Sequence, residues 1–128
     1  FHAEAPYKAA ITINPVDLRN GERAGIDGRT HRRLFRGEVK IDSKIDLHGL
    51  TLTRAQEQLT RFIESTAFRG CRCVLVITGK GAGVLKRHAP DWLKRPPLAV
   101  YVLALAEARS KDGGSGALYV LLRRKRKG

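Results

Sequence analysis

The sequence contains no methionine, only two cysteines and few aromatic residues, and none of its apolar runs is long enough to span a membrane. Cys71 and Cys73 are too few for a disulfide framework or for the three or four ligands of a zinc site. If both lie in one strand, they face the same side, and we expect core residues of a cytoplasmic protein, whose thiols stay reduced. Polar residues interrupt the first ten positions, so no signal peptide is predicted there, and the missing methionine indicates a trimmed fragment.

Acidic residues are scarce relative to basic ones, with 12 Asp and Glu against 25 Lys and Arg and a formal net charge of +13. The basic excess occurs in residues 1–40, in residues 41–122 and in the tail, where every residue of 123–127 is Lys or Arg. Self-repulsion at this charge costs stability, and contacts with phosphates relieve it. We therefore expect nucleic acid, DNA or RNA, as the partner, and no membrane. A basic protein without a polyanion partner is the second interpretation.

Apolar periodicity and turn residues predict one α/β domain. The expected order is strand 45–48, helix 53–70, strand 73–77, helix 84–94, strand 98–105 and strand 117–122. A strand–helix–strand unit makes a right-handed crossover between parallel strands, so the first three strands should be parallel. The fourth follows a loop without a helix and should return antiparallel. The sequence thus predicts a β-α-β-α-β-β mixed four-stranded sheet with two helices.

Local signals bound the two helices. Thr53 begins a Thr-Arg-Ala-Gln stretch that matches a capping box, and Gly70 is expected to stop that helix. Pro90 lacks an amide, so the second helix should kink or break there. His88 lies among apolar residues of this helix and is expected in the core.

Residues 1–44 are assigned to a basic N-terminal extension, residues 45–122 to the domain and residues 123–128 to a basic tail. Within the extension, residues 11–13 suit a short edge strand ended by Asn14 and Pro15, and residues 26–36 suit a short basic helix. The arginines of this helix either face phosphates or form a solvated surface. The candidate phosphate contacts in the extension and tail are Arg29, Arg32, Arg33, Arg123 and Arg124.

Three glycine-marked segments are expected to meet at one edge of the sheet. Asp46 to Gly49 ends the first strand, Gly79-Lys80-Gly81 follows the second, and the stretch with Gly113, Gly114 and Gly116 precedes the fourth. Open α/β sheets bind ligands at this edge. The loop after the second strand matches neither a P-loop nor the dinucleotide fingerprint.

The polar residues of these segments are those that phosphodiester cleavage requires. Asp46 and His48 are two apart in a predicted strand, so they should share a face; His48 can transfer protons near neutral pH, and Asp46 can orient it or hold a metal. Lys80 between two glycines can approach a phosphate closely, as can the amides of residues 113–116. Taken singly, each residue has a structural alternative, in which Asp46 caps a turn, His48 ends a strand and the glycines only shape turns.

Three motifs stand in the order and spacing of Smr (small MutS-related) domains, which the sequence resembles from residue 45 to 122: Asp46-Leu47-His48-Gly49, Thr78-Gly79-Lys80-Gly81 and Gly113-Gly114-Ser115-Gly116-Ala117. The resemblance, most of all to stand-alone bacterial members, implies a fold like the C-terminal domain of the third translation initiation factor. Similar domains nick DNA, cut RNA or bind nucleic acid in repair, recombination control or ribosome rescue. Asp46 and His48 match the family's catalytic candidates, whereas Lys80 falls at a variable position and its role is our own inference.

Three functional hypotheses follow. The first is an endonuclease with His48 as general acid or base, the second a binding module without catalysis, and the third a ribosome-docking adaptor. The sequence does not decide whether the substrate is DNA or RNA. It also leaves Mg²⁺ or Mn²⁺ open as a cofactor, because Asp46 and His48 alone are too few ligands for a metal site.

Overall fold

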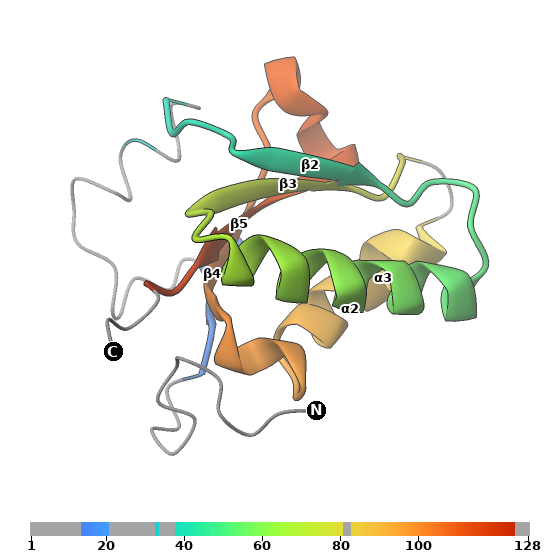
Figure 1. Cartoon of the computed structure of the whole chain (residues 1–128). Helices are drawn as coiled ribbons and strands as arrows, with labels where there is room; N and C mark the ends of the chain where they lie inside the picture. Colours follow the sequence, from blue (N-terminus) through green and yellow to red (C-terminus); the bar gives the residue numbers. More distant parts are fainter. Residues whose placement is uncertain (1–13, 21–32, 34–37, 81–82, 125–128) are drawn as a thin grey trace.

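The computed structural model describes residues 14–20, 33, 38–80 and 83–124, which form a sheet with two helices packed on one of its faces (Figure 1). The strands are β1 (Val16–Asp17), β2 (Ser43–Asp46), β3 (Cys73–Ile77), β4 (Val102–Glu107) and β5 (Ala117–Leu122), and the helices are α2 (Leu52–Phe68) and α3 (Val84–Leu93). Short 3-10 turns lie at η1 (Leu18–Asn20), η2 (Leu98–Val100), η3 (Ser110–Asp112) and η4 (Gly114–Gly116).

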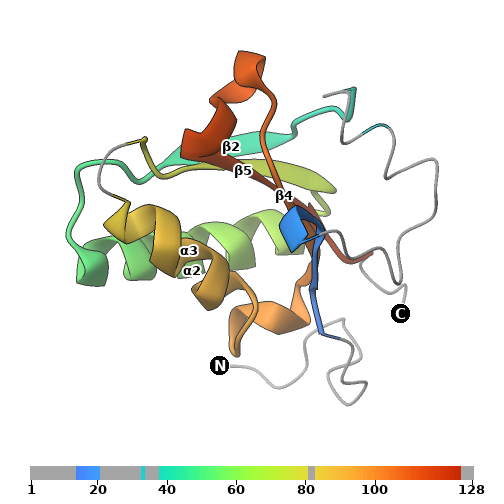
Figure 2. The same ribbon diagram turned by 180° about the vertical axis from the view of Figure 1, so that it is seen from behind.

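The sheet has the order β1-β4-β5-β3-β2. β2 pairs with β3 in parallel, and β5 lies antiparallel between β3 and β4. The structure therefore confirms a mixed sheet in which β2, β3 and β4 share one direction and β5 returns against them. α2 connects β2 to β3 and α3 connects β3 to β4, and because both connections join parallel strands in the same direction across the sheet, both helices lie on the same face (Figures 1 and 2).

The sheet has five strands instead of the four predicted. Val16 and Asp17 pair in parallel with Ala104 and Leu105, and thus add β1 at the edge opposite β2 (Figure 2). A two-residue strand is too short to produce a period in the sequence, which explains why it was missed. The predicted strand at 11–13 and the predicted helix at 26–36 lie outside the described residues, apart from the exposed Arg33.

Several predicted boundaries shift in the structure. The first strand of the domain is Ser43–Asp46, so His48 lies in the turn that follows it. The predicted strand 98–105 divides into the turn η2 and the strand β4, because Leu98 packs into the core from the 3-10 turn and not from a strand.

Three predictions about the helices can be compared with the structure: the N-cap of α2, its end at Gly70 and the effect of Pro90 on α3. The N-cap of α2 is Thr51 and not Thr53: the Thr51 hydroxyl accepts a hydrogen bond from the Arg54 amide at 3.2 Å. Gly70 follows the helix with φ +83° and ends it, as predicted. At Pro90 the sequence predicts a kink or a break, and the break does not occur, because α3 continues through Pro90; burial of Ala89, Pro90 and Leu93 offsets the lost hydrogen bond.

Alternate residues of β3 build a core on each side of the sheet. Val74 and Val76 pack in the cluster beneath α2 and α3, whereas Cys73 and Leu75 belong to the cluster on the opposite face. β3 is therefore buried on both faces, as its continuous apolar sequence favours. Cys71 precedes β3 and packs toward the helices, whereas Cys73 faces the other side of the sheet. The expectation that both cysteines face the same side is therefore wrong. Burial raises the pKa of the Cys73 thiol to about 12, which makes it an inert core residue.

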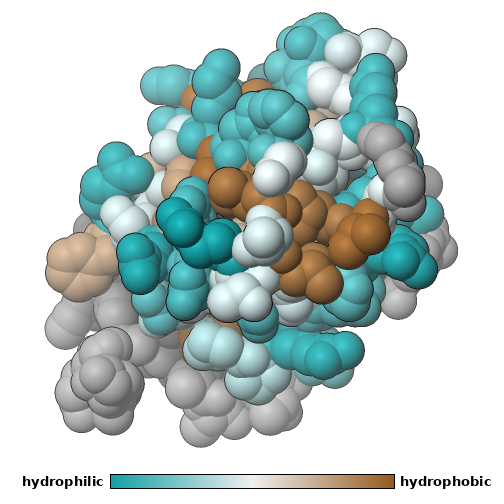
Figure 3. Space-filling model, turned by 90° about the vertical axis from the view of Figure 1, so that its right-hand side faces the viewer, coloured by the Kyte–Doolittle hydropathy of each residue, from teal (hydrophilic) through white to brown (hydrophobic). Residues whose placement is uncertain are grey.

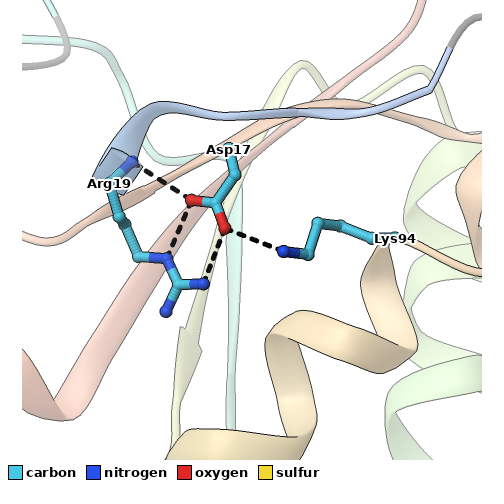
Figure 4. Close-up of polar contacts among 3 residues, drawn as sticks. All are labelled: Asp17, Arg19 and Lys94. Atoms are coloured by element: carbon cyan, nitrogen blue, oxygen red, sulfur yellow. Dashed lines mark hydrogen bonds and ion pairs between the residues drawn. The ribbon is translucent and has the colours of Figure 1, made fainter. Parts of the chain in front are cut away.

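A buried ion cluster ties β1 to the end of α3 (Figure 4). The Asp17 carboxylate, 3% exposed, accepts hydrogen bonds from Arg19 Nε and Nη2 at 2.9 and 2.7 Å and from Lys94 Nζ at 2.9 Å. Burial by itself would raise the pKa of Asp17, but the hydrogen bonds from Arg19 and Lys94 outweigh it and lower the pKa to about 2. The short edge strand is therefore held by charge as well as by its backbone pairing.

Candidate active site

Asp46 and His48 meet at the carboxyl end of β2. Asp46 is the last residue of the strand, and the fully buried Leu47 anchors the turn that follows. Asp46 Oδ1 accepts a hydrogen bond from the His48 amide at 3.0 Å and lies 2.6 Å from His48 Nδ1. The two side chains therefore meet because the backbone turns back on Asp46, and not through the alternation of a strand, as the sequence analysis assumed.

The contact with Asp46 fixes what the imidazole can do. The His48 ring and then the His48 amide lower the pKa of Asp46, so this group is a carboxylate at neutral pH. A carboxylate at Nδ1 holds a proton on that nitrogen and leaves Nε2 to act on a substrate. The side chains of His48 and Asp46 are 69% and 49% exposed, so a large polymer can reach the pair.

The glycine loops come together beside this pair. Gly116 O accepts hydrogen bonds from the Thr78 and Gly79 amides at 2.8 and 3.1 Å. An added Cβ on Gly79 would lie 3.3 Å from His48 Cβ, and one on Gly116 would lie 2.8 Å from Lys80 Cγ. The structure therefore brings the three predicted segments to one edge of the sheet, and these glycines permit the close approach.

The segment between β4 and β5 stands on the side of the sheet away from α2 and α3 (Figures 1 and 2). Within it, the amides of Gly113, Gly114 and Gly116 donate to carbonyl groups of the same loop, at 3.3, 3.0 and 3.1 Å. Gly113 has φ +119° and Gly114 φ +56°, which other residues rarely adopt. These glycines therefore shape the loop, while their amides are already engaged.

Tyr119 holds this loop to β5, a role that the sequence analysis missed. Its hydroxyl donates to Asp112 Oδ2 at 2.5 Å and accepts from the Arg109 amide at 3.2 Å, and the residue is 2% exposed. A tyrosine within an apolar strand has the pattern of an ordinary core residue. The sequence carries no signal for this role, because the contact depends on how residues 109 and 112 fold back over the hydroxyl of Tyr119.

The basic candidates are distributed unequally around the site. Lys80 is exposed directly after Gly79. Arg123 and Arg124 follow the far end of β5, about 17 Å along the strand from Ala117 at the site edge, so these two arginines are not brought to Asp46 and His48. Gly81, Arg29 and Arg32 lie outside the described residues. His88, expected in the core, is half-buried and stacks on Trp92 with ring centroids 5.9 Å apart.

An apolar patch borders the site on its helical side. Figure 3 shows it on the end of the molecule where α2 and α3 begin. The first residues of these helices, Leu52 and Val84, are 38% and 44% exposed. Phosphates lose hydration over such a surface, so a charged backbone is expected to avoid it.

Asp46 and His48, with the other donors in the part of the chain that the structure describes, do not fit a metal ion held by side chains alone. Among the described residues, no group of three or more His, Cys, Asp and Glu side chains gathers. One oxygen of Asp46 already accepts from His48, whereas Mg²⁺ and Mn²⁺ need several oxygen ligands.

Among the residues that the structure describes, no helix has the length and apolarity to cross a membrane.

Comparison with known proteins agrees with these features. A model of the Smr domain matches residues 45–123. The chain belongs to the Smr domain family. Its similarity to solved Smr structures also confirms the fold: the Smr domain of Thermus thermophilus MutS2 is 30% identical, with a TM-score of 0.58 over 63% of this chain and 98% of that one. YdaL, a stand-alone small MutS-related protein from Escherichia coli, is 27% identical, with a TM-score of 0.68 over 80% and 81% of the two chains.

Curated relatives of the Smr domain carry the name ribosome rescue factor SmrB. The protein from Shewanella sp. (strain W3-18-1) is 35% identical over 98 residues, which are 77% of this chain and 54% of the relative. The protein from Yersinia enterocolitica is 37% identical over 100 residues, covering 78% and 55%. The chain thus spans about half the length of the curated relatives it matches.

Proposed function

We propose that this Smr domain is an endonuclease that cleaves RNA, with Asp46 and His48 as its acid–base centre. The observation that carries the proposal is the 2.6 Å contact between Asp46 Oδ1 and His48 Nδ1 in an exposed turn at the ligand-binding edge of the sheet. The name of the SmrB relatives supports a role in ribosome quality control in the cytoplasm.

A cleavage step needs only the residues present. His48 Nε2 takes the proton of the ribose 2′-hydroxyl, and the 2′-oxygen attacks the adjacent phosphorus. The bond from phosphorus to the 5′-oxygen breaks, and that oxygen takes a proton from a water molecule, which gives a 2′,3′-cyclic phosphate and a 5′-hydroxyl. The hydroxide left behind is neutralised when His48 releases the proton that it took. Asp46 stabilises the imidazolium that forms, and the Lys80 ammonium group stabilises the negative charge on the phosphorus oxygens.

A cleavage assay tests the proposal. The wild type and His48→Ala are incubated with an end-labelled structured RNA and with supercoiled plasmid, in chelator and in Mg²⁺ or Mn²⁺. We expect the wild type alone to cut RNA, without added metal, and to leave cyclic phosphate ends. Cutting of plasmid alone would replace RNA by DNA as the substrate, with water as nucleophile and a metal required.

A non-catalytic binding module is the second candidate, favoured by the net charge of +13 and by a pair that is exposed instead of enclosed. In that case the wild type cuts neither RNA nor plasmid, and the wild type and His48→Ala bind RNA equally. His48→Ala then also supports cellular function. A ribosome-docking adaptor would instead bind ribosomes but bind naked RNA weakly.

A further inference from the structure

The exposed face of β2 carries a lysine that the proposed mechanism does not use. Lys44 and Asp46 are two apart in this strand, and their partners across the parallel pair are Leu75 and Ile77. Leu75 and Ile77 both pack in the core cluster on the face away from α2 and α3. Lys44 and Asp46 therefore project from that same face, where Lys44 is exposed.

Lys44 and Lys80 flank the acid–base pair. Lys44 lies back along β2, with about 7 Å of strand between it and Asp46. Lys80 follows β3 past Gly79, and its side chain lies against Gly116 at the start of β5, on the side of β3 away from β2. A backbone that follows β2 to Asp46 and His48 would therefore meet Lys44 before the pair, and Lys80 where it continues towards the start of β5.

The acidic neighbours of Lys44 are engaged elsewhere. Asp42 Oδ2 accepts hydrogen bonds from the Arg72 and Cys73 amides at 2.8 and 3.3 Å, and Asp46 is held by His48. On α2, by contrast, the exposed Arg61 has Glu64 one helical turn further on, close enough to offset its charge.

The two borders of the site also favour this path. On the helical side, a phosphate that lies over the apolar patch at the starts of α2 and α3 loses hydration without gaining a partner, which disfavours that approach (Figure 3). On the other side of the sheet, the segment between β4 and β5 stands beside the strands (Figure 1). The face of β2 lies between these two borders.

We propose that this face of β2 is the track on which the nucleic acid backbone enters the site, with Lys44 binding a phosphate next to the one that is cleaved. The proposal rests on the proposed function and adds to it a substrate-binding residue and a direction of approach. Because a lysine–phosphate contact reads no base, the contact strengthens binding equally for all sequences.

Binding measurements test the track. Fluorescence anisotropy with a labelled RNA, made uncleavable by one deoxynucleotide at the cut, compares the wild type with Lys44→Gln, Lys44→Arg and the matched control Arg61→Gln. Losing one phosphate contact should lower the slope of log K against log salt by about 0.7, which corresponds to about fivefold weaker binding at 0.1 M salt. We expect this loss for Lys44→Gln, recovery in Lys44→Arg and less than a twofold effect for Arg61→Gln.

Kinetics and modified oligonucleotides separate the outcomes. Lys44→Gln should raise KM for cleavage with kcat nearly unchanged, because the contact forms in the ground state as well as in the transition state. An uncharged methylphosphonate at one position beside the cut should abolish the difference between wild type and Lys44→Gln. If the wild type cuts RNA but Lys44→Gln loses no more RNA affinity than Arg61→Gln, the track is overturned and the proposed function is not. The same holds if the affinity difference between wild type and Lys44→Gln persists with a methylphosphonate at every position tested. A wild type that neither binds nor cuts RNA overturns both proposals.

Discussion

The same oxygen of Asp46 takes part in the fold and in the proposed chemistry. Its Oδ1 accepts from the His48 amide, which shapes the turn, and contacts His48 Nδ1, which orients the ring. Asparagine keeps an oxygen at this position but lacks the charge that stabilises an imidazolium. The variant Asp46→Asn should therefore cleave RNA about 10- to 100-fold more slowly with an unchanged melting temperature. Single-turnover rates and thermal melts check this, and an equal rate for the two proteins would contradict a role for the charge.

Gly79 offers a second test at single-residue scale, with a built-in control. Gly79 and Gly70 both have positive φ, at +91° and +83°, so alanine costs about 1–2 kcal/mol of stability at either position. Only at Gly79 would the new methyl group meet His48, at 3.3 Å, because nothing lies within 4 Å at Gly70. Gly79→Ala should therefore lower kcat severalfold, whereas Gly70→Ala should lose stability alone. Urea denaturation and cleavage rates, measured well below the melting temperature, distinguish the two effects.

The loop between β4 and β5 depends on one phenol. Tyr119→Phe removes a hydrogen bond to Asp112 and one from the Arg109 amide, which should cost about 1–2 kcal/mol. Hydrogen exchange should then rise across residues 109–116 and stay unchanged in α2. Because Gly116 O also accepts from the Thr78 and Gly79 amides, a looser loop should slow cleavage while leaving RNA affinity intact. A rise in hydrogen exchange of similar size across the whole protein would instead indicate a general loss of stability.

How far the sequence predicts each element depends on length and on local competition. The long apolar run of β3 and the amphipathic α2 are strong signals, and both were predicted. β1 has only two residues and is stabilised by pairing with β4 and by the distant Lys94, so no local pattern reveals it. Thr51 and Thr53 both suit an N-cap, and the choice between them depends on the turn built around Leu47. The site motifs were predicted as segments, while the contact of His48 with Asp46 depends on a turn geometry that their spacing does not encode.

At the scale of the whole molecule, the two edges of the sheet have different roles. β2 carries Lys44 and Asp46 at one edge, and β1 closes the other, where Asp17 joins it to α3 through Lys94. In the proposed function the lateral edge formed by β2 contacts substrate, whereas the opposite lateral edge, formed by β1, is fixed by buried charge. Stability and proposed activity therefore reside at opposite edges of one sheet, and changes at Asp17 should leave the site geometry intact.

This separation predicts a specific acid response. The pKa of Asp17 is about 2 in the folded protein against an ordinary value of 3.8, so its contribution is complete above about pH 5 and most of it is lost as the pH falls to about 2. The difference is worth about 2 kcal/mol, with little solvent screening because the carboxylate is 3% exposed. Urea denaturation at several values between pH 6 and pH 2 should show Asp17→Asn losing about 2 kcal/mol less than the wild type over this range. Other carboxylates, such as Asp42, titrate in both proteins and cancel in the comparison. Parallel curves would mean that Arg19 and Lys94 do not stabilise the charged form of Asp17.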